Sequence, residues 1–151
     1  MSEKARTIGQ TSKETGVKVT TIRYYESVGL LTAPDRTSSG QRVYDKAAIE
    51  RLRFIRHARE LGFSVEAIAE LIALQTDPDA SCTHIDEIAR HHLADVRRRL
   101  TQLEALEAEL KRMVAACAGG RVAACSVLSS LSDHDQCLAH EHEKLDIVIG
   151  K

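Results

Sequence analysis

The chain has 151 residues, of which 43% are apolar, 28% charged and 3% aromatic, and its formal net charge is −1. It contains no run of about 18 apolar residues and no basic segment leading into an apolar stretch, so we expect no membrane span, no export signal and a cytoplasmic protein. Its length fits one modest globular protein or two small modules, and its many Ala, Leu, Arg and Glu residues favour a mainly α-helical fold.

Two short helices are predicted near the N-terminus. Thr7 and Gln10 fit a capping box, and the helix that follows should end at Gly16. A second helix should run from Val19 to near Gly29. Two helices joined by a tight Gly-containing turn predict a helix-turn-helix.

The second of these helices carries side chains suited to DNA. Arg23, Tyr24 and Tyr25 lie close together on it and could contact phosphates and base edges. The alternative is that a tyrosine packs in the small core, and we expect this for one of the two.

Residues 34–44 predict a hairpin, or wing. Ser38, Ser39 and Gly40 favour a turn between two short segments of alternating polarity. Arg36 and Arg42 flank that turn, where they could straddle a DNA backbone.

Two further helices should complete this part of the chain. The third is expected from about Asp45 to Glu60, and the fourth should begin after Ser64 as its N-terminal cap. The third helix has an apolar face made of Ile49, Leu52, Ile55 and Ala58, and a basic surface made of Arg51, Arg53, Arg56 and Arg59.

The charge is unevenly distributed. Residues 1–59 contain 12 Lys and Arg against 6 Asp and Glu, whereas residues 76–151 contain 9 against 13. A basic, helical half favours a polyanionic partner, although a solvated surface of uneven charge fits the numbers equally well.

A long helix should follow the linker at residues 77–79. There is no Pro or Gly between Thr83 and Cys117, and apolar residues recur at three- and four-residue steps, which is typical of a coiled coil. So small a chain cannot cover the whole stripe, so we favour a homodimer over a fold in which the third and fourth helices cover it. The stripe consists of Leu93, Val96, Leu100, Leu103, Leu110, Val114 and Cys117, with Leu106 offset and Glu107 at the next stripe position.

The four cysteines are expected to be reduced thiols that serve metal or redox chemistry. Cys82 and Cys117 lie at opposite ends of the long helix, about 50 Å apart at 1.5 Å per residue, so they cannot bind one ion within one chain. An antiparallel dimer would bring each Cys82 to Cys117 of the partner subunit. Cys125 returns to Cys117 across a loop of small residues, and three thiolates suit a soft or borderline ion.

Cys137, His140 and His142 cluster in the polar C-terminal tail. They could form an accessory metal site, or the tail could simply be solvated. No Cys-x-x-Cys motif occurs, which argues against a thioredoxin-like protein and a simple zinc finger.

Taken together, these motifs resemble the MerR family of bacterial metal-responsive transcription regulators. One departure is Lys18, where the family's recognition helix usually has a Ser or Thr cap. The resemblance covers residues 6 to about 131 and rests on TIRYYE at 21–26, GLL at 29–31, Arg36, GQRVY at 40–44, LRFIR at 52–56, RELGFS at 59–64 and the cysteine pair around Gly119-Gly120.

The resemblance implies a winged helix-turn-helix domain (1–76), a linker and antiparallel dimerisation helix (77–117), and a metal-binding loop, short helix and tail (118–151). Such regulators bind promoter DNA as homodimers, and metal then distorts the DNA so that RNA polymerase can use the promoter. By motif match, the DNA contacts would be Thr20, Arg23, Tyr24, Tyr25, Arg36, Gly40, Arg42, Tyr44 and Arg59.

The expected metal ligands are Cys82, Cys117 and Cys125. Cys82 resembles the divalent branch of the family, because the monovalent sensors have Ser there. Two thiolates leave a +1 ion at a local charge of −1, and a third does the same for a +2 ion. We therefore expect zinc, cadmium or lead ahead of mercury, and control of heavy-metal resistance or efflux genes. The alternatives are a copper(I) or other monovalent sensor and a thiol redox sensor; no nucleophile–base pair or phosphate loop points to an enzyme.

Overall fold

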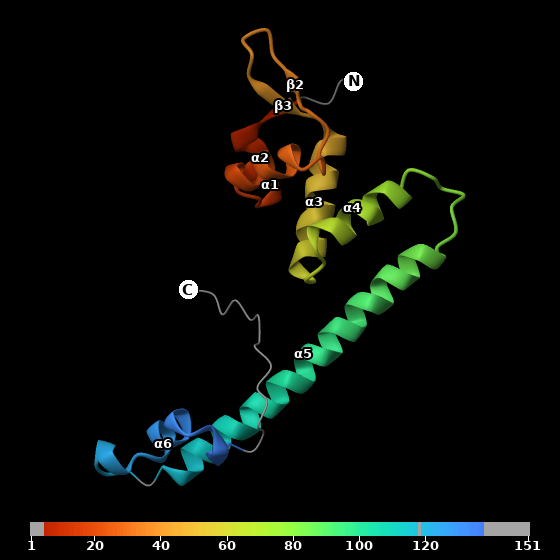
Figure 1. Cartoon of the computed structure of the whole chain (residues 1–151). Helices are drawn as coiled ribbons and strands as arrows, with labels where there is room; N and C mark the ends of the chain where they lie inside the picture. Colours follow the sequence, from red (N-terminus) through yellow and green to blue (C-terminus); the bar gives the residue numbers. More distant parts are fainter. Residues whose placement is uncertain (1–4, 118, 138–151) are drawn as a thin grey trace. The chain divides into compact units, whose positions relative to one another are not determined.

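The computed structural model describes residues 5–117 and 119–137 (Figure 1). The chain forms two compact units, Met1–Ile88 and Ala89–Lys151. Among the described residues, no helix combines the length and the apolar character that crossing a bilayer requires.

The first unit contains the predicted helix-turn-helix and wing. A third short strand, β1, was not predicted from the sequence, because two residues carry no detectable alternation; it pairs with β3 in a sheet of order β1-β3-β2, and both pairings are antiparallel. The elements in chain order are β1 (Arg6–Thr7), α1 (Ile8–Thr15), α2 (Val19–Ser27), β2 (Asp35–Arg36), β3 (Arg42–Tyr44), α3 (Lys46–Glu60) and α4 (Val65–Leu74).

Local capping explains where these helices begin and end. The predicted capping box is confirmed, since Thr7 N donates to Gln10 Oε1 at 2.9 Å and the Gln10 amide donates to the Thr7 hydroxyl. Gly16 ends α1 in the left-handed conformation, with φ at 72°. Ser64 caps α4 as predicted, accepting from Ala67 N at 3.1 Å. Lys18 makes no side-chain cap at the start of α2.

A single apolar core holds this unit together. The helix α3 buries Leu52, Ile55 and Ala58, the face expected from its sequence, and Ile22 of α2 is fully enclosed. The core residues are Val17, Ile22, Tyr25, Leu30, Leu31, Tyr44, Leu52, Ile55, Ala58, Ile68 and Ile72.

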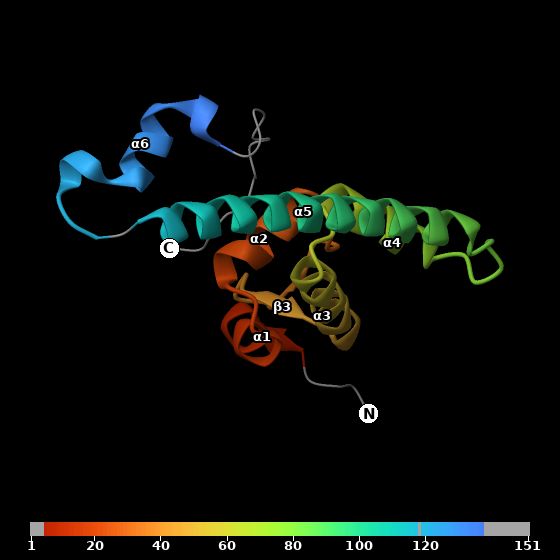
Figure 2. The same ribbon diagram turned by 90° about the horizontal axis from the view of Figure 1, so that it is seen from below.

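The long helix predicted from the sequence is α5 (Thr83–Ala116), which Figure 2 shows as one unbroken helix. It is followed by η1 (Val122–Ala124), α6 (Ser126–Ser132) and η2 (His134–Gln136). Two residues near the C-terminal end of α5, Glu109 and Met113, are buried. The apolar stripe is exposed in the single chain, with Leu93, Val96, Leu100, Leu103, Leu106, Leu110 and Val114 each 38–69% exposed.

Candidate nucleic-acid interface and thiol site

The recognition helix α2 presents polar and aromatic side chains to solvent. Thr20 and Arg23 are exposed, and Tyr24 is 49% exposed. Tyr25 is buried, with its ring centroid 5.8 Å from that of Tyr24. One tyrosine of the pair therefore packs in the core, as the sequence had suggested, and the other remains available to a ligand.

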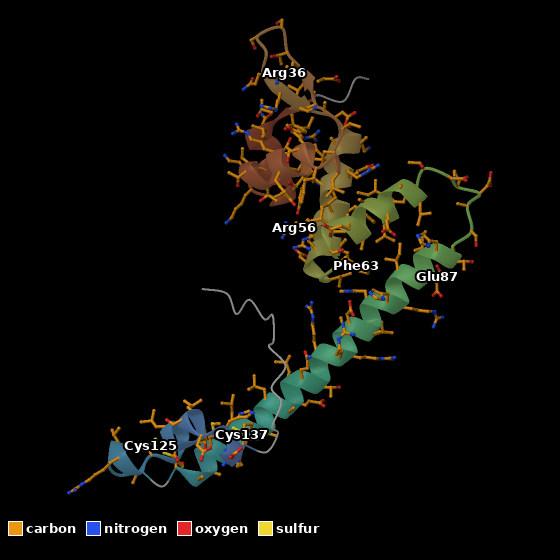
Figure 3. All side chains as sticks on the ribbon, in the orientation of Figure 1. Arg36, Arg56, Phe63, Glu87, Cys125 and Cys137 are labelled. Carbon is orange, nitrogen blue, oxygen red and sulfur yellow. The ribbon has the colours of Figure 1, made fainter. Side chains whose placement is uncertain are left out.

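The wing is stabilised by its own turn residues. Gly40 has a positive φ of 80°, and its amide donates to the Thr37 carbonyl at 2.8 Å. Arg36 Nη1 donates to the Gly40 carbonyl at 3.0 Å, which leaves its other donors directed away from the turn. Arg36 is exposed on the hairpin (Figure 3), where a guanidinium can meet a phosphate.

A carboxylate joins the wing to the recognition helix. Glu26 of α2 accepts a hydrogen bond from the Tyr44 hydroxyl and lies 3.4 Å from Nε of Arg42, measured at Oε2. Burial and this hydrogen bond raise the pKa of Tyr44, so its hydroxyl stays a donor at neutral pH. Sequence reasoning did not identify Glu26, although it directly follows the two tyrosines of the motif.

These contacts change the assignment of two expected DNA ligands. Tyr25 and Tyr44 are 6% and 2% exposed, so their side chains are not available to a duplex in this conformation. The motif match could not distinguish a side chain that touches DNA from one that holds the touching residues in place. We assign both to the core behind the interface.

Two arginines of α3 also serve the fold. Arg59 Nη1 donates to the Phe63 carbonyl at 2.7 Å, just beyond the end of α3, and the rest of this exposed side chain stays accessible. Arg56 Nη1 donates to the Thr15 carbonyl at 2.7 Å and passes close to Gly16. A Cβ at Gly16 would lie 2.1 Å from Arg56 Nη1, so a glycine is needed there for space as well as for its φ. Arg56 and Phe63 are labelled in Figure 3.

The loop after α5 brings two thiols together. Gly119 and Gly120 have φ values of 72° and 116°, which lets the chain reverse. The Cys125 thiol then lies against the backbone amides of Leu128 and Val127 and forms a hydrogen bond with Cys117. Those amides, and Cys117 after them, lower the pKa of Cys125 and favour its thiolate, the form that binds metal.

Cys82 belongs to the other unit. It is exposed and directly precedes α5, whose 34 residues correspond to a length of about 50 Å. Among residues 5–117 and 119–137, no group of three or more His, Cys, Asp or Glu side chains gathers as a metal site. A complete three-thiolate set therefore requires a second chain.

Cys137 has different surroundings. Its Sγ lies 4.0 Å from the Ser130 carbonyl oxygen, and its pKa is raised by burial and then by the nearby Glu109 carboxylate. These surroundings disfavour the thiolate. His140 and His142, the other expected members of an accessory site, lie outside the described residues.

Comparison with known proteins gives family matches over most of the chain. Residues 6–75 match the "MerR HTH family regulatory protein" family, and residues 49–113 match "MerR, DNA binding". The chain is 41% identical over 127 residues to the mercuric resistance operon regulatory protein of Serratia marcescens, covering 83% of this chain and 86% of that protein. It is 36% identical over 126 residues to heavy metal-dependent transcription regulator 2 of Rhizobium meliloti, with coverages of 83% and 86%.

A solved structure agrees with these sequence matches. The transcription regulator PbrR691 from Ralstonia metallidurans CH34, crystallised in complex with lead(II), superposes with a TM-score of 0.74 at 34% identity. The match covers 83% of this chain and 98% of that chain.

Proposed function

Because the chain belongs to the MerR family of helix-turn-helix transcription regulators, which bind DNA and are not enzymes, we propose that it activates heavy-metal resistance or efflux genes on binding a divalent soft ion. The observation that carries this proposal is the contact between Cys117 and Cys125 in the loop that follows α5. The mercury- and lead-related relatives support a metal ligand for this chain too.

The proposed DNA interface consists of the exposed side chains of α2 and the wing, with Arg59. Arg23 and Arg36 carry charge to the surface, while Glu26 holds half-buried Arg42 beside the recognition helix. Most of these contacts would go to phosphates, which position the protein without reading sequence. The full set is Thr20, Arg23, Tyr24, Arg36, Gly40, Arg42 and Arg59.

Removing a phosphate contact should weaken binding to every DNA sequence. We expect Arg23→Ala and Arg42→Ala each to reduce the slope of log K against log salt by about 0.9, the value for one phosphate contact. Titration of a duplex at several salt concentrations measures the slope. Arg121→Ala, an exposed arginine in the other unit, is the control and should leave it unchanged. An unchanged slope in both test variants would show that DNA docks elsewhere.

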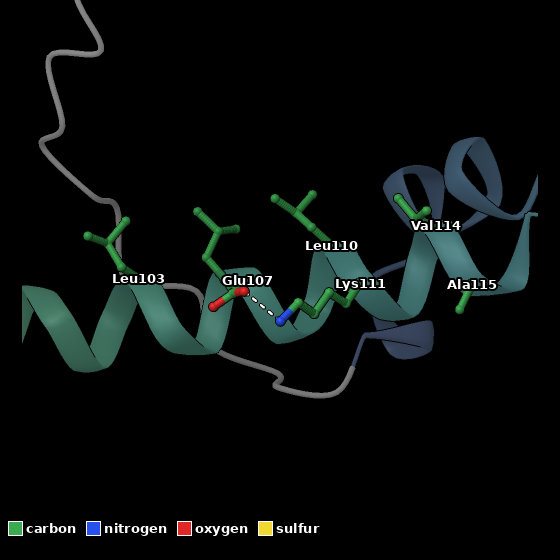
Figure 4. A pocket seen from close by; sticks show the side chains of 7 residues that line it. Leu103, Glu107, Leu110, Lys111, Val114 and Ala115 are labelled. Carbon is green, nitrogen blue, oxygen red and sulfur yellow. Dashed lines mark ion pairs between the residues drawn. The ribbon is translucent and has the colours of Figure 1, made fainter.

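The proposed dimer interface is the exposed stripe of α5. Leu103, Leu106, Leu110 and Val114 line a groove of about 480 Å³, beside the ion pair of Glu107 and Lys111 at 2.5 Å (Figure 4). A second copy of the same helix offers an apolar stripe of the same kind, and a symmetric interface needs only one such surface.

A shared metal site would also fix the register of that dimer. If Cys82 faces Cys117 of the partner subunit in an antiparallel pair, the residue numbers of facing positions always add up to 199. The same register buries apolar residues against each other, which supports it. It pairs Ile85 with Val114, Leu93 with Leu106, and Val96 with Leu103.

The proposed site holds the ion between Cys117 and Cys125 of one subunit and Cys82 of the partner subunit. Three thiolates leave a divalent ion with a local charge of −1, which favours zinc, cadmium or lead, and mercury after them. The metal supplies a link between a loop of one subunit and the linker of the other. Because that linker follows α4, the link can change how the two DNA-binding units are placed and so bend the promoter for RNA polymerase.

A panel of metal ions on a promoter reporter tests this function. Zinc, cadmium or lead salts should induce the reporter, and Cys117→Ser or Cys125→Ser should abolish induction by every ion while operator binding persists. Induction that survives in both variants would contradict the proposal. Cys82→Ser should lose the divalent response and gain a weak response to copper(I), for which two thiolates suffice.

The contact between Cys117 and Cys125 also supports two other sensors. A copper(I) or other monovalent ion could bind those two thiolates alone, and induction by copper in the unaltered protein would favour that alternative. The same pair could form a disulfide switch, which thiol titration after mild oxidation would reveal.

A further inference from the structure

The C-terminal end of α5 carries a buried ion pair that no metal chemistry uses. Glu109 is 4% exposed, and its Oε1 accepts from Arg112 Nη2 at 2.6 Å and from Nε at 3.2 Å. The same Arg112 Nη2 donates to Oγ of Ser130, in α6, at 3.1 Å. Ser130 is itself 4% exposed. Arg112 therefore connects two helices that are separated by the cysteine loop.

This connection matters because α6 has little else to hold it. The helix has seven residues, too few to be stable alone in water. Two of its large apolar residues, Leu128 and Leu131, are 48% and 72% exposed, so they add little burial. A buried hydroxyl bonded to a guanidinium is a strong polar contact by comparison.

The position of α6 decides where the second thiol lies. Cys125 is the N-terminal cap residue of α6, and its carbonyl accepts from Ser129 N at 3.0 Å, next to the anchored Ser130. Beyond α6, Cys137 returns to the same place, with its Sγ 4.0 Å from the Ser130 carbonyl oxygen. Cys125 and Cys137 flank α6 in Figure 3.

We propose that Arg112 is a positioning residue: by joining Glu109 to Ser130, it fixes α6 on α5 and holds Cys125 against Cys117. This inference deepens the proposed metal function, and its role in metal capture rests on that function. The closeness of the two thiols, however, can be measured without any metal.

The test measures the equilibrium between the reduced pair and its disulfide in a glutathione buffer. Cys117 and Cys125 transfer two electrons to glutathione disulfide, giving one protein disulfide and two molecules of glutathione. The full-length background is Cys82→Ser with Cys137→Ser, so that no other protein thiol competes. The equilibrium constant reports the effective concentration of one thiol at the other.

Arg112→Ala and Ser130→Ala should each lower this effective concentration about tenfold, as expected for one lost charge-assisted hydrogen bond. The double variant should lower it little further, because both changes break the same connection. Ser130→Ala keeps the Glu109–Arg112 pair, so it leaves no buried charge unpaired, and Ser130→Thr should restore the parent value. Lys111→Ala, which removes an exposed ion pair of the same helix, is the matched control and should have no effect.

Cadmium binding to the otherwise unaltered chain is measured for the same substitutions. Parallel losses of cadmium affinity and effective thiol concentration support the proposal. An unchanged effective concentration in both single variants overturns it, as does a loss of thiol closeness with cadmium affinity unchanged in a protein whose Cys117→Ser variant fails to bind. If the unaltered protein binds no cadmium while the thiol effect is present, the positioning role stands and the proposed metal function fails.

Discussion

A mixed dimer with Cys82→Ser in one subunit and Cys117→Ser in the other should keep one intact metal site with near-native affinity. In the antiparallel arrangement, Cys82 of the second subunit still meets Cys117 and Cys125 of the first, so one end of the dimer is complete and the other has lost two ligands. The physical basis is the length of α5, which keeps Cys82 and Cys117 of one chain at opposite ends of a 34-residue helix.

Differently tagged subunits and a two-step purification give the mixed dimer, and the bound metal per dimer is then measured. The unaltered dimer, with two sites, and the Cys82→Ser homodimer, with no complete site, are the controls. Ligation within a single chain would leave both ends of the mixed dimer damaged. Loss of all tight binding would therefore refute the shared site.

Leu100→Glu combined with Leu103→Glu should convert the dimer to a monomer of about 16.7 kDa. Each side chain is 40% or more exposed in the single chain and would be covered by the second copy. A pair of charges without partners in that interface, repeated in both subunits, should raise the dissociation constant more than about a thousandfold. Light scattering at micromolar protein concentration measures the mass.

Thr101→Glu is the matched control, since it adds a charge to the same turn of α5 but replaces an exposed residue outside the stripe. It should leave the dimer intact. A parent protein that is already monomeric at micromolar concentration would remove the basis for the proposed interface and for the shared site together.

The order of elements followed from local signals. The Thr7–Gln10 box, Gly16 and the Ser64 cap each depend on residues within one turn, so the sequence alone predicted where α1 and α4 begin and where α1 ends. The strand β1 depends on pairing with β3, more than thirty residues away, and no local pattern reports such a contact.

Side-chain roles were predicted less well than positions. Tyr44 lies in a strand whose alternation is only three residues long, so its burial depends on α2 and α3 packing over it. The Glu26 bridge and the Arg112 connection both join residues 18 apart in the sequence. Spacing did predict that Cys125 could return to Cys117, because a glycine-rich loop needs no further partner to reverse.

The opposite exposures of neighbouring residues on α5 have a practical consequence for protein engineering. Glu109 and Met113 are buried within the chain, whereas Leu110 and Val114, one position along, remain open for the partner. Loop attachment and subunit pairing thus use different sides of the same two turns. A loop with other donor atoms should therefore be graftable between Cys117 and Cys125 without redesigning the stripe. That separation makes the chain a scaffold for biosensors tuned to different ions.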